Sequence, residues 1–267
     1  MHIIVCVKQV PDPEAPFANF KIDPATNKVI PPQGVSPVIN GFDEQAVEAA
    51  LRLKDGRSDV KITVISVGND LVMDVIKKPL SMGADELVLV QDPAIPNGDS
   101  YTTGAVLAAA IKKLGAFDLV LCGRQASDWD QGQVPLILAE LMGIPAITIA
   151  KKVDVADGAV KVERVVVDGF ETVQAPLPAL VTISNELGEA RYPTLKGIMA
   201  AGRKKPTVWS AKDLGLDFAQ SSQNGSKVRM LKVFVPEKSS KCEIISADSP
   251  AEAGVKLASR LREDKVI

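Results

Sequence analysis

Four apolar, β-branched runs in the first half of the chain each precede a stretch with helical spacing. The runs cover residues 2–7, 61–67, 86–91 and 118–122. Two of the helical stretches cover 71–82 and 99–114, and the other two begin near Phe42 and after Gln133. Continuous apolar runs of this length are typical of strands that are buried on both faces of a sheet. This alternation predicts a doubly wound α/β fold with a parallel sheet.

The polar loop at residues 123–134 is the first candidate site. It follows the fourth strand and leads into a helix that ends at Gly143. Open α/β sheets bind ligands beyond the carboxyl ends of their strands, where the strand order reverses. Backbone N–H groups at the helix start would attract a phosphate there. The plain alternative is that Asp128 and Asp130 only cap the helix.

Two other strand ends converge on the same edge of the predicted sheet, at residues 5–9 and 67–68. Asn40 lies close to the start of the first helix, where it either caps the helix or hydrogen-bonds a ligand, and capping is the expected role. The chain contains neither a G-x-G-x-x-G fingerprint nor a P-loop lysine motif. A standard dinucleotide or P-loop phosphate grip is therefore not expected.

The second half of the chain has a different texture. Alternating strands at 151–155, 159–167 and 171–175 surround the turns Asp157-Gly158 and Asp168-Gly169, and a further strand covers 178–183. Residues 185–205 begin irregularly and end in a short helix at 197–201. We therefore predict one domain over 1–220, with a β-meander inserted at 151–183. Residues 221–226 have a linker composition, and 249–265 form an amphipathic helix with Ser249 as N-cap, so that 221–267 form a C-terminal arm.

Composition excludes several function classes. The chain has 267 residues and a formal net charge of −2, without a basic run interleaved with aromatic residues, which argues against nucleic-acid binding. Its single histidine and three widely spaced cysteines cannot form a zinc site or a histidine-based triad, so no catalytic or metal-ligating residues are predicted. The odd cysteine count and the absence of an apolar run of roughly 18 residues predict a cytoplasmic protein without a membrane span.

Six blocks of sequence, in this order, resemble the beta (small) subunit of electron-transfer flavoproteins. The blocks lie at 5–12 (Val-Cys-Val-Lys-Gln-Val-Pro-Asp), 39–51, 82–85 (Met-Gly-Ala-Asp), 123–128 (Gly-Arg-Gln-Ala-Ser-Asp), 162–182 and 191–199 (Arg-Tyr-Pro-Thr-Leu-Lys-Gly-Ile-Met). One position departs from the family pattern, because Val167 stands where an acidic residue is usual. The resemblance extends over nearly the whole chain.

The resemblance implies a Rossmann-like adenine-nucleotide-binding fold and a heterodimer with an alpha subunit that holds the redox FAD. Such proteins pass electrons between an acyl-CoA dehydrogenase-type flavoenzyme and a quinone- or ferredoxin-linked acceptor. This function needs no catalytic residues in the chain, since the cofactor supplies the redox chemistry. The implied nucleotide-binding residues are Cys6, Asn40, Gly41, Phe42, Asp43, Val67, Gly123, Arg124, Gln125, Ala126, Ser127, Asp128, Trp129, Asp130, Gln131, Gly132, Gln133 and Val134.

The resemblance also implies two protein-binding regions. Leu195 aligns with a leucine that inserts into a pocket of the partner dehydrogenase, and Tyr192, Ile198 and Met199 lie near it in the sequence. The alternative for Leu195 is an ordinary buried leucine. The C-terminal arm is expected to contact the alpha subunit.

The identity of the nucleotide stays open between AMP and a second FAD. Val134 lacks the hydroxyl group that would hydrogen-bond a lone phosphate, which favours FAD, as does the opening at residues 8–12, while residues 189–205 are closer to the AMP-holding carriers. Trp129 fits neither pattern. A rival of another class is a stand-alone ATP- or AMP-binding enzyme or sensor on the same fold, for which only Asp128 and Asp130 offer acidic groups.

Overall fold

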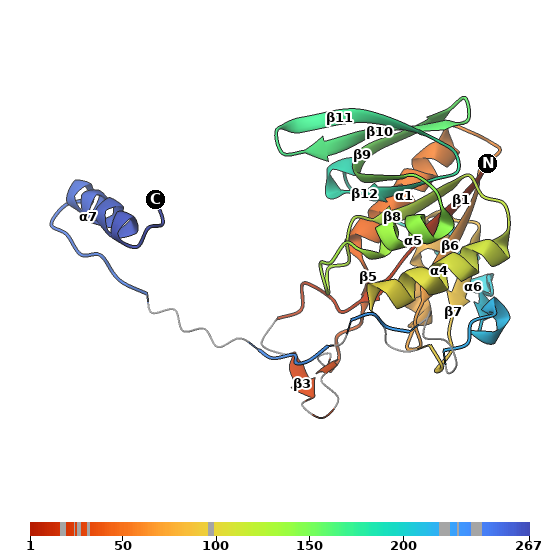
Figure 1. Cartoon of the computed structure of the whole chain (residues 1–267), viewed down its shortest axis with the longest axis horizontal. Helices are drawn as coiled ribbons and strands as arrows, with labels where there is room; N and C mark the ends of the chain where they lie inside the picture. The colour runs from red at the N-terminus through yellow and green to blue at the C-terminus, as the bar shows by residue number, and fades with distance from the viewer. Residues whose placement is uncertain are drawn as a thin grey trace. The chain divides into compact units, whose positions relative to one another are not determined.

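In the computed structural model of the chain, a mixed sheet organises the first of two units (Figure 1). The units are Met1–Leu231 and Lys232–Ile267. The structure describes residues 1–16, 20–23, 25, 28–30, 33–95, 99–218, 225–228, 230–235 and 242–267. The predicted linker falls largely on residues 221–224, outside the described residues, so the predicted domain boundary at 220/221 stays a prediction.

The sheet has the strand order β11-β10-β9-β12-β8-β1-β6-β7-β13. The strands are β1 (His2–Cys6), β6 (Lys61–Val67), β7 (Glu86–Val90), β8 (Leu119–Gly123), β9 (Ala146–Ala156), β10 (Ala159–Val166), β11 (Gly169–Pro176), β12 (Ala179–Ile183) and β13 (Thr207–Trp209). Each pair of neighbouring strands in the part of the sheet that runs β9-β12-β8-β1-β6-β7-β13 is parallel. The strands β9, β10 and β11 form an antiparallel meander. The predicted α/β class with a mainly parallel, doubly wound sheet is confirmed.

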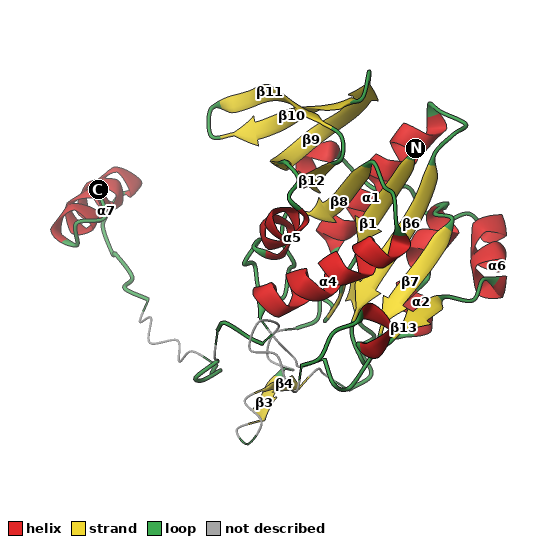
Figure 2. Cartoon of the chain, turned by 45° about the vertical axis from the view of Figure 1, so that its right-hand side comes forward, coloured by secondary structure: helices red, strands yellow, loops and turns green. Residues whose placement is uncertain are grey.

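Helices cover both faces of the parallel strands (Figure 2). Residues alternate between the faces, because successive side chains of a strand point in opposite directions. Ile3 and Val5 of β1 share a buried cluster with α1 (Gly41–Asp55), α2 (Met73–Ile76) and α3 (Lys78–Met82). Ile4 and Cys6 share the other cluster with α4 (Ser100–Leu114) and α5 (Val134–Met142).

The predicted single helix at 71–82 is wrong, since α2 and α3 are separate. α2 ends at Ile76, and α3 carries Pro79 in its first turn. A proline ring collides with the carbonyl group of the residue four positions earlier and lacks an N–H group to donate. The helix therefore restarts at Lys78 instead of continuing through the proline.

The meander begins earlier than predicted. β9 starts at Ala146, before the change of texture at 151, and its first residues pair in parallel with β12. The register shifts near Ile149, which has φ of 60° and donates its N–H to Thr182 Oγ1 at 2.9 Å. Asp157 and Gly158 both have positive φ, as the predicted two-residue hairpin turn requires.

A long excursion follows β1 and returns to it. It contains β2 (Gln9–Val10), the hairpin of β3 (Lys21–Asp23) and β4 (Lys28–Ile30), and β5 (Val38–Ile39). Residues 24, 26 and 27, between β3 and β4, lie outside the described residues. β5 pairs antiparallel with β2, and the Asn40 N–H donates to the Lys8 carbonyl at 2.9 Å. This pairing brings the start of α1 to the end of β1.

Four further elements complete the described part of the chain. α6 (Leu195–Arg203) is longer than the predicted helix at 197–201, since Thr194 caps it by accepting the Gly197 N–H at 3.0 Å. Short 3-10 turns lie at Asn185–Leu187 and Lys212–Leu214. In the second unit, α7 (Pro250–Glu263) begins after the predicted cap Ser249 and has no buried side chain. Across the part of the chain that the structure describes, no helix combines the length and apolarity needed to cross a membrane.

Candidate functional site

The strand order reverses between β1 and β8, and the candidate site lies at that point. The chain runs from β1 through β6 to β7 on one side and returns to β8 on the other side of β1. The carboxyl ends of β1, β6 and β8 are therefore neighbours at one edge of the sheet. This is the position at which open α/β sheets bind ligands. Cys6, Val67 and Gly123 end these three strands, as the sequence predicted.

Asp43, in the first turn of α1, ties two of the strand ends together. Its carboxylate accepts the Lys8 N–H at 2.8 Å and the Gly123 N–H at 2.9 Å. The side chain is buried, and this burial raises the pKa of Asp43 to about 7, although hydrogen bonds with Lys8, Asn40 and Gly123 and the Lys8 charge oppose the rise. A buried carboxyl group with a pKa near neutrality therefore lies between the chain after β1 and the end of β8.

Gly123 leaves no room for a side chain. A Cβ atom at this position would lie 2.5 Å from Asp43 Oδ1 and 2.7 Å from Phe42 Cβ. The close approach of α1 to the end of β8 therefore requires glycine here.

Asn40 occupies the N-cap position of α1, but its side chain does not cap the helix. Its Nδ2 donates to the Gln125 carbonyl at 2.8 Å, and its Oδ1 accepts the Ser127 N–H at 3.2 Å. The expected capping role is wrong for the side chain, because these bonds hold the loop at 123–134 instead. The side chain is fully buried, so leaving these amide atoms unpaired would be costly.

The two loop carboxylates also have partners other than the helix. Asp128 forms a bidentate ion pair with Lys8 Nζ at 2.7 and 2.8 Å, and Asp130 Oδ1 accepts Gln125 Nε2 at 2.9 Å. The N-cap residue of α5 is Gln133. The alternative in which Asp128 and Asp130 merely cap the helix is therefore not what the structure has.

The last turn of the loop presents backbone N–H groups. Asp130 and Gly132 have φ of 50° and 62°, which reverses the chain before α5. Among the described residues, no acceptor pairs with the N–H groups of Gly132, Gln133 and Val134. Gln131 anchors the turn to α4 by accepting Ser100 Oγ at 2.8 Å. Unpaired amides at a helix start suit a phosphate oxygen.

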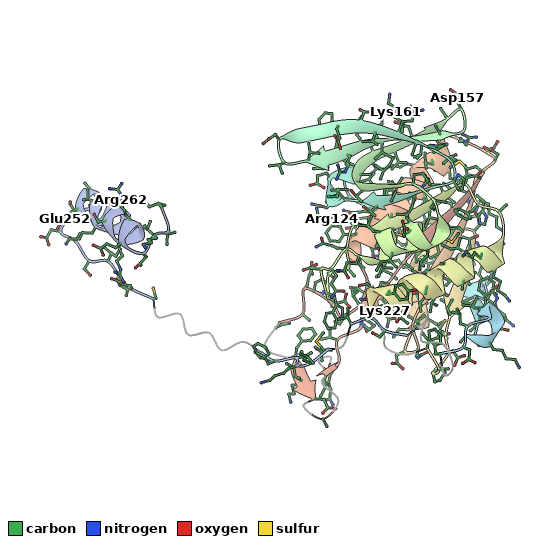
Figure 3. The ribbon with its side chains drawn as sticks, in the orientation of Figure 1. Arg124, Asp157, Lys161, Lys227, Glu252 and Arg262 are labelled. Carbon is green, nitrogen blue, oxygen red and sulfur yellow. The ribbon has the colours of Figure 1, made fainter. Side chains whose placement is uncertain are left out.

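Arg124 and Trp129 give the loop its aromatic and cationic character. The Arg124 guanidinium lies 5.5 Å from the centre of the Phe42 ring and donates to Ser184 Oγ at 3.3 Å, beside the end of β8 (Figure 3). The Trp129 side chain belongs to a residue that is 52% exposed, and the backbone N–H of Trp129 donates to the Ala126 carbonyl. An exposed indole at this edge is available to stack on a ring.

Three further predicted nucleotide residues, Cys6, Val67 and Gly41, lie at two strand ends and at the start of α1. Cys6 and Cys122 are both buried, and the hydrogen bond with Cys6, together with burial, raises the pKa of the Cys122 thiol and keeps it protonated. Val67 is half-buried at the end of β6, and Gly41 is exposed as the first residue of α1. No group of three or more His, Cys, Asp or Glu side chains that could hold a metal ion occurs in the described ranges.

The predicted partner residues are exposed on or beside α6. Tyr192 is 88% exposed and Leu195 76% exposed. Ile198 and Met199 are also exposed, one helical turn after Leu195. The alternative in which Leu195 is an ordinary buried leucine is therefore wrong.

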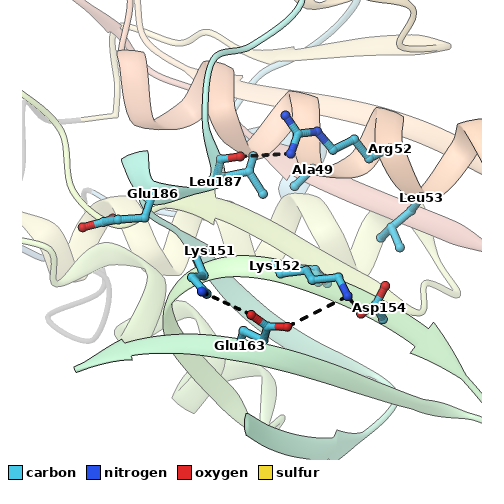
Figure 4. Close-up of a pocket in the computed structure, with 10 residues that line it drawn as sticks. Ala49, Arg52, Leu53, Lys151, Lys152, Asp154, Glu163, Glu186 and Leu187 are labelled. Atoms are coloured by element: carbon cyan, nitrogen blue, oxygen red, sulfur yellow. Dashed lines mark hydrogen bonds and ion pairs between the residues drawn. The ribbon is translucent and has the colours of Figure 1, made fainter. Parts of the chain in front are cut away.

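A separate cavity of about 420 Å³ lies between α1 and the meander (Figure 4). None of the predicted nucleotide residues line it. Its cations are already paired, since Lys151 contacts Glu163 at 3.3 Å and Lys152 contacts Asp154 at 3.0 Å. Nothing in its charge distribution selects a ligand.

Sequence comparisons identify relatives over the whole chain. Residues 28–214 match the family model described as the electron transfer flavoprotein domain. The chain is 41% identical over 262 residues to the electron transfer flavoprotein subunit beta of Megasphaera elsdenii, covering 96% of this chain and 95% of that protein. It is 36% identical over 267 residues to the caffeyl-CoA reductase-Etf complex subunit CarD of Acetobacterium woodii, covering all of both chains. It is 35% identical over 264 residues to protein FixA of Azorhizobium caulinodans, covering 95% and 92%. The chain therefore belongs to the electron transfer flavoprotein family, among its beta subunits.

Proposed function

We propose that this chain pairs with an alpha subunit, binds an adenine nucleotide at the 123–134 loop, and presents α6 to a flavoenzyme that delivers electrons to the alpha-subunit FAD. The observation that carries the nucleotide site is the bonding of Asp43 and Asn40 to the ends of β1 and β8 and to the loop. This bonding holds unpaired amides at the start of α5 in place for an anion. The family's beta subunits support the pairing with an alpha subunit.

The residues present fit a nucleotide phosphate. The N–H groups of Gly132, Gln133 and Val134 would hold the phosphate oxygens, with the Ser127 hydroxyl beside them. Asp128 and Asp130 shape the loop through Lys8 and Gln125, which keeps both carboxylates turned to cations or amides. The Phe42–Arg124 pair and Trp129 provide flat surfaces for a ring.

The chain's own residues bind and orient, and they do not react. A flavin, when bound, supplies the redox chemistry. The buried thiol pair and the carboxyl group of Asp43 face the strand ends without a nucleophile–base geometry among the described residues. This arrangement supports an electron-carrier subunit over a stand-alone nucleotide enzyme, whose required base or metal ligand would have to come from Asp128 or Asp130.

The donor of electrons is proposed to be a CoA-thioester oxidoreductase of the acyl-CoA dehydrogenase type. One relative is named as a subunit of a complex between a caffeyl-CoA reductase and an Etf. A quinone- or ferredoxin-linked protein would accept the electrons.

We place the protein in the cytoplasm, a proposal that the free state of Cys6, Cys122 and Cys242 supports.

Counting nucleotides tests the proposed site. The chain is purified as a heterodimer with its alpha subunit, extracted with acid, and FAD and AMP are quantified per dimer. Two FAD per dimer support a second FAD in this subunit and open the way to flavin-based electron bifurcation. One FAD and one AMP per dimer would mean that this subunit binds AMP in place of a second FAD and would identify a simple carrier. One FAD and no other adenine nucleotide contradicts the nucleotide site itself.

The rival function is tested with the same preparation. If the chain were a stand-alone ATP- or AMP-consuming enzyme, the chain purified alone would turn over ATP or AMP. We expect no turnover from the single chain, and electron transfer from a reduced dehydrogenase only in the heterodimer.

A further inference from the structure

Arg191 joins the segment before α6 to α1. Its Nε contacts Glu48 Oε2 at 2.8 Å, and its Nη2 contacts Asp55 Oδ2 at 2.6 Å (residues 143 and 136 positions apart in the sequence). Its backbone N–H also donates to Glu48 Oε2 at 3.1 Å. One guanidinium thus bridges two carboxylates that lie about two turns apart on the same helix.

The carboxylate at the centre of this bridge is buried and doubly paired. The Glu48 side chain is 6% exposed, and it also accepts Arg52 Nε at 2.9 Å. Burial alone would raise its pKa, but the bonds from Arg191 and Arg52 outweigh burial and hold the pKa of Glu48 below its usual range. Arg52 in turn donates to the Leu187 carbonyl at 2.9 Å. The whole stretch from Leu187 to Arg191 is therefore bound to α1 by charged groups.

α6 itself is bound to α3 near its start and to the turn after α3 at its end. Gly197 lies so close to the Ser81 carbonyl that a Cβ atom would collide with it. Lys204 Nζ donates to the Ala84 and Asp85 carbonyls at 3.1 and 2.6 Å. Between these attachments and Arg191, the side chains of Tyr192 and Leu195 project into solvent.

Two attachments on either side of exposed apolar residues make a preorganised docking surface. Ordering a loop during association costs free energy, which a surface already held in place avoids. The attachment to α3 fixes the helix itself. The Arg191 bridge fixes the chain that enters the helix at the residue directly before Tyr192.

We propose that Arg191 is a positioning residue for electron-donor docking, acting through Leu195 by holding the entry to α6 on Glu48 and Asp55. This inference rests on the proposed function, in which α6 docks the donor. Arg191 does not contact the nucleotide site, so its loss should weaken docking and leave the nucleotide and the flavin as they are.

The test uses the heterodimer and an acyl-CoA dehydrogenase reduced with its own acyl-CoA. Rates are measured against dehydrogenase concentration for the wild type, Arg191→Gln and the control Arg57→Gln. Within the described part of the chain, the Arg57 guanidinium forms an ion pair with the exposed Asp59 alone, so Arg57→Gln should match the wild type. For Arg191→Gln we expect KM for the dehydrogenase to rise about tenfold, with kcat and the FAD content unchanged.

Two results overturn the inference. One is an unchanged KM in Arg191→Gln. The other is a loss of kcat and FAD together with the rise in KM, which identifies a general structural role. If Arg191→Gln does not fold, Arg191→Lys replaces it, because lysine keeps the charge but lacks the fork that reaches both carboxylates. KM should then rise less, and an unchanged KM contradicts the inference.

Leu195→Ala separates this inference from the proposed function. If neither Leu195→Ala nor Arg191→Gln changes KM, the proposed docking role of α6 fails. If Leu195→Ala raises KM while Arg191→Gln does not, docking at α6 stands and the positioning role of Arg191 fails.

Discussion

The carboxylate of Asp43 accepts the backbone N–H of Gly123 at 2.9 Å, although the two residues lie 80 positions apart in the sequence. This bond joins the first turn of α1 to the last residue of β8. It explains why the loop that follows β8 starts in a defined place, and it makes Gly123 the most sensitive glycine of the site.

Gly123→Ala should weaken both the fold and the nucleotide site. The new Cβ would lie 2.5 Å from Asp43 Oδ1, so α1 or β8 must shift. Overpacking of this kind costs about 1–3 kcal/mol in the free energy of unfolding. Urea denaturation and nucleotide analysis measure the two effects. The control is Gly56→Ala, since a Cβ at Gly56 would meet only the Leu53 carbonyl, at 3.8 Å. Full nucleotide content in Gly123→Ala would contradict the assignment.

Asp43 should make stability depend on pH. Its folded pKa of about 7 lies above the ordinary 3.8, so the folded state holds a proton that the unfolded state has released between these values. The contribution of Asp43 to the free energy of unfolding is therefore greatest below about pH 4. It falls by roughly 1 kcal/mol per pH unit up to pH 7, where it levels off. Asp43→Asn should lack this component. The measurement is the difference in unfolding free energy between the two proteins from pH 5 to pH 8. A difference that does not change with pH would show an ordinary pKa.

Gly132→Val should release the nucleotide selectively. Gly132 has φ of 62°, and a Cβ there would approach the Arg124 carbonyl to 3.1 Å. The turn would then move its N–H groups away from the phosphate position. Gly143→Val is the matched control, because Gly143 has φ of 67° with no atom within 4 Å of a Cβ. Both variants should lose about 1–2 kcal/mol of stability from backbone strain. Only Gly132→Val should lose nucleotide, and equal retention in both would count against the loop.

Leu195→Ala should slow electron delivery while the flavin content stays constant. Leu195 is 76% exposed, so its truncation leaves no cavity in this chain. A few apolar anchors carry most of the binding free energy of an interface, so KM for the reduced dehydrogenase should rise about tenfold or more. Val208→Ala removes the same kind of exposed apolar surface from β13 and serves as control. A parallel loss of flavin would mean that Leu195 is structural.

Removing residues 236–267 should reduce heterodimer assembly more than it reduces the stability of the first unit. The described residues of α7 have no buried side chain, and Val255 and Leu257 are exposed on it. An amphipathic helix without a surface to bury against contributes little to its own unit. Gel filtration of the mixed subunits and thermal unfolding of the single chain measure the two effects. A large drop in unfolding temperature with intact assembly would reverse this assignment.

Much of the fold could be predicted because its signals are local. β1, β6, β7 and β8 are continuous apolar runs. The Asp157-Gly158 pair by itself predicts the hairpin turn with positive φ at both residues. β13 was missed, since three residues are too short to show any period. The break at Pro79 was present in the sequence, and a stricter use of proline geometry would have found it.

The candidate site was less accessible to prediction. Its location followed from the convergence of strand ends, and Asn40 was placed correctly at the start of α1. The partner of each side chain was not predictable, because Asn40 reaches Gln125 and Lys8 reaches Asp128 across long sequence separations. The Arg191–Glu48 pair left no sequence signal at all, since both are ordinary charged residues.

α1 fixes the relative orientation of two separate groups of contacts. Its first turn carries Asp43 at the strand ends, and its later turns carry Glu48 and Asp55 beneath Arg191. Each residue advances a helix by roughly 100°, so one residue inserted between Asp43 and Glu48 would swing Glu48 off the face that Arg191 meets. Length changes should be tolerated in the excursion between β2 and β5, whose two ends pair with each other in a two-stranded sheet. They should not be tolerated inside α1, which sets the distance and the angle between the proposed nucleotide site and the proposed docking helix.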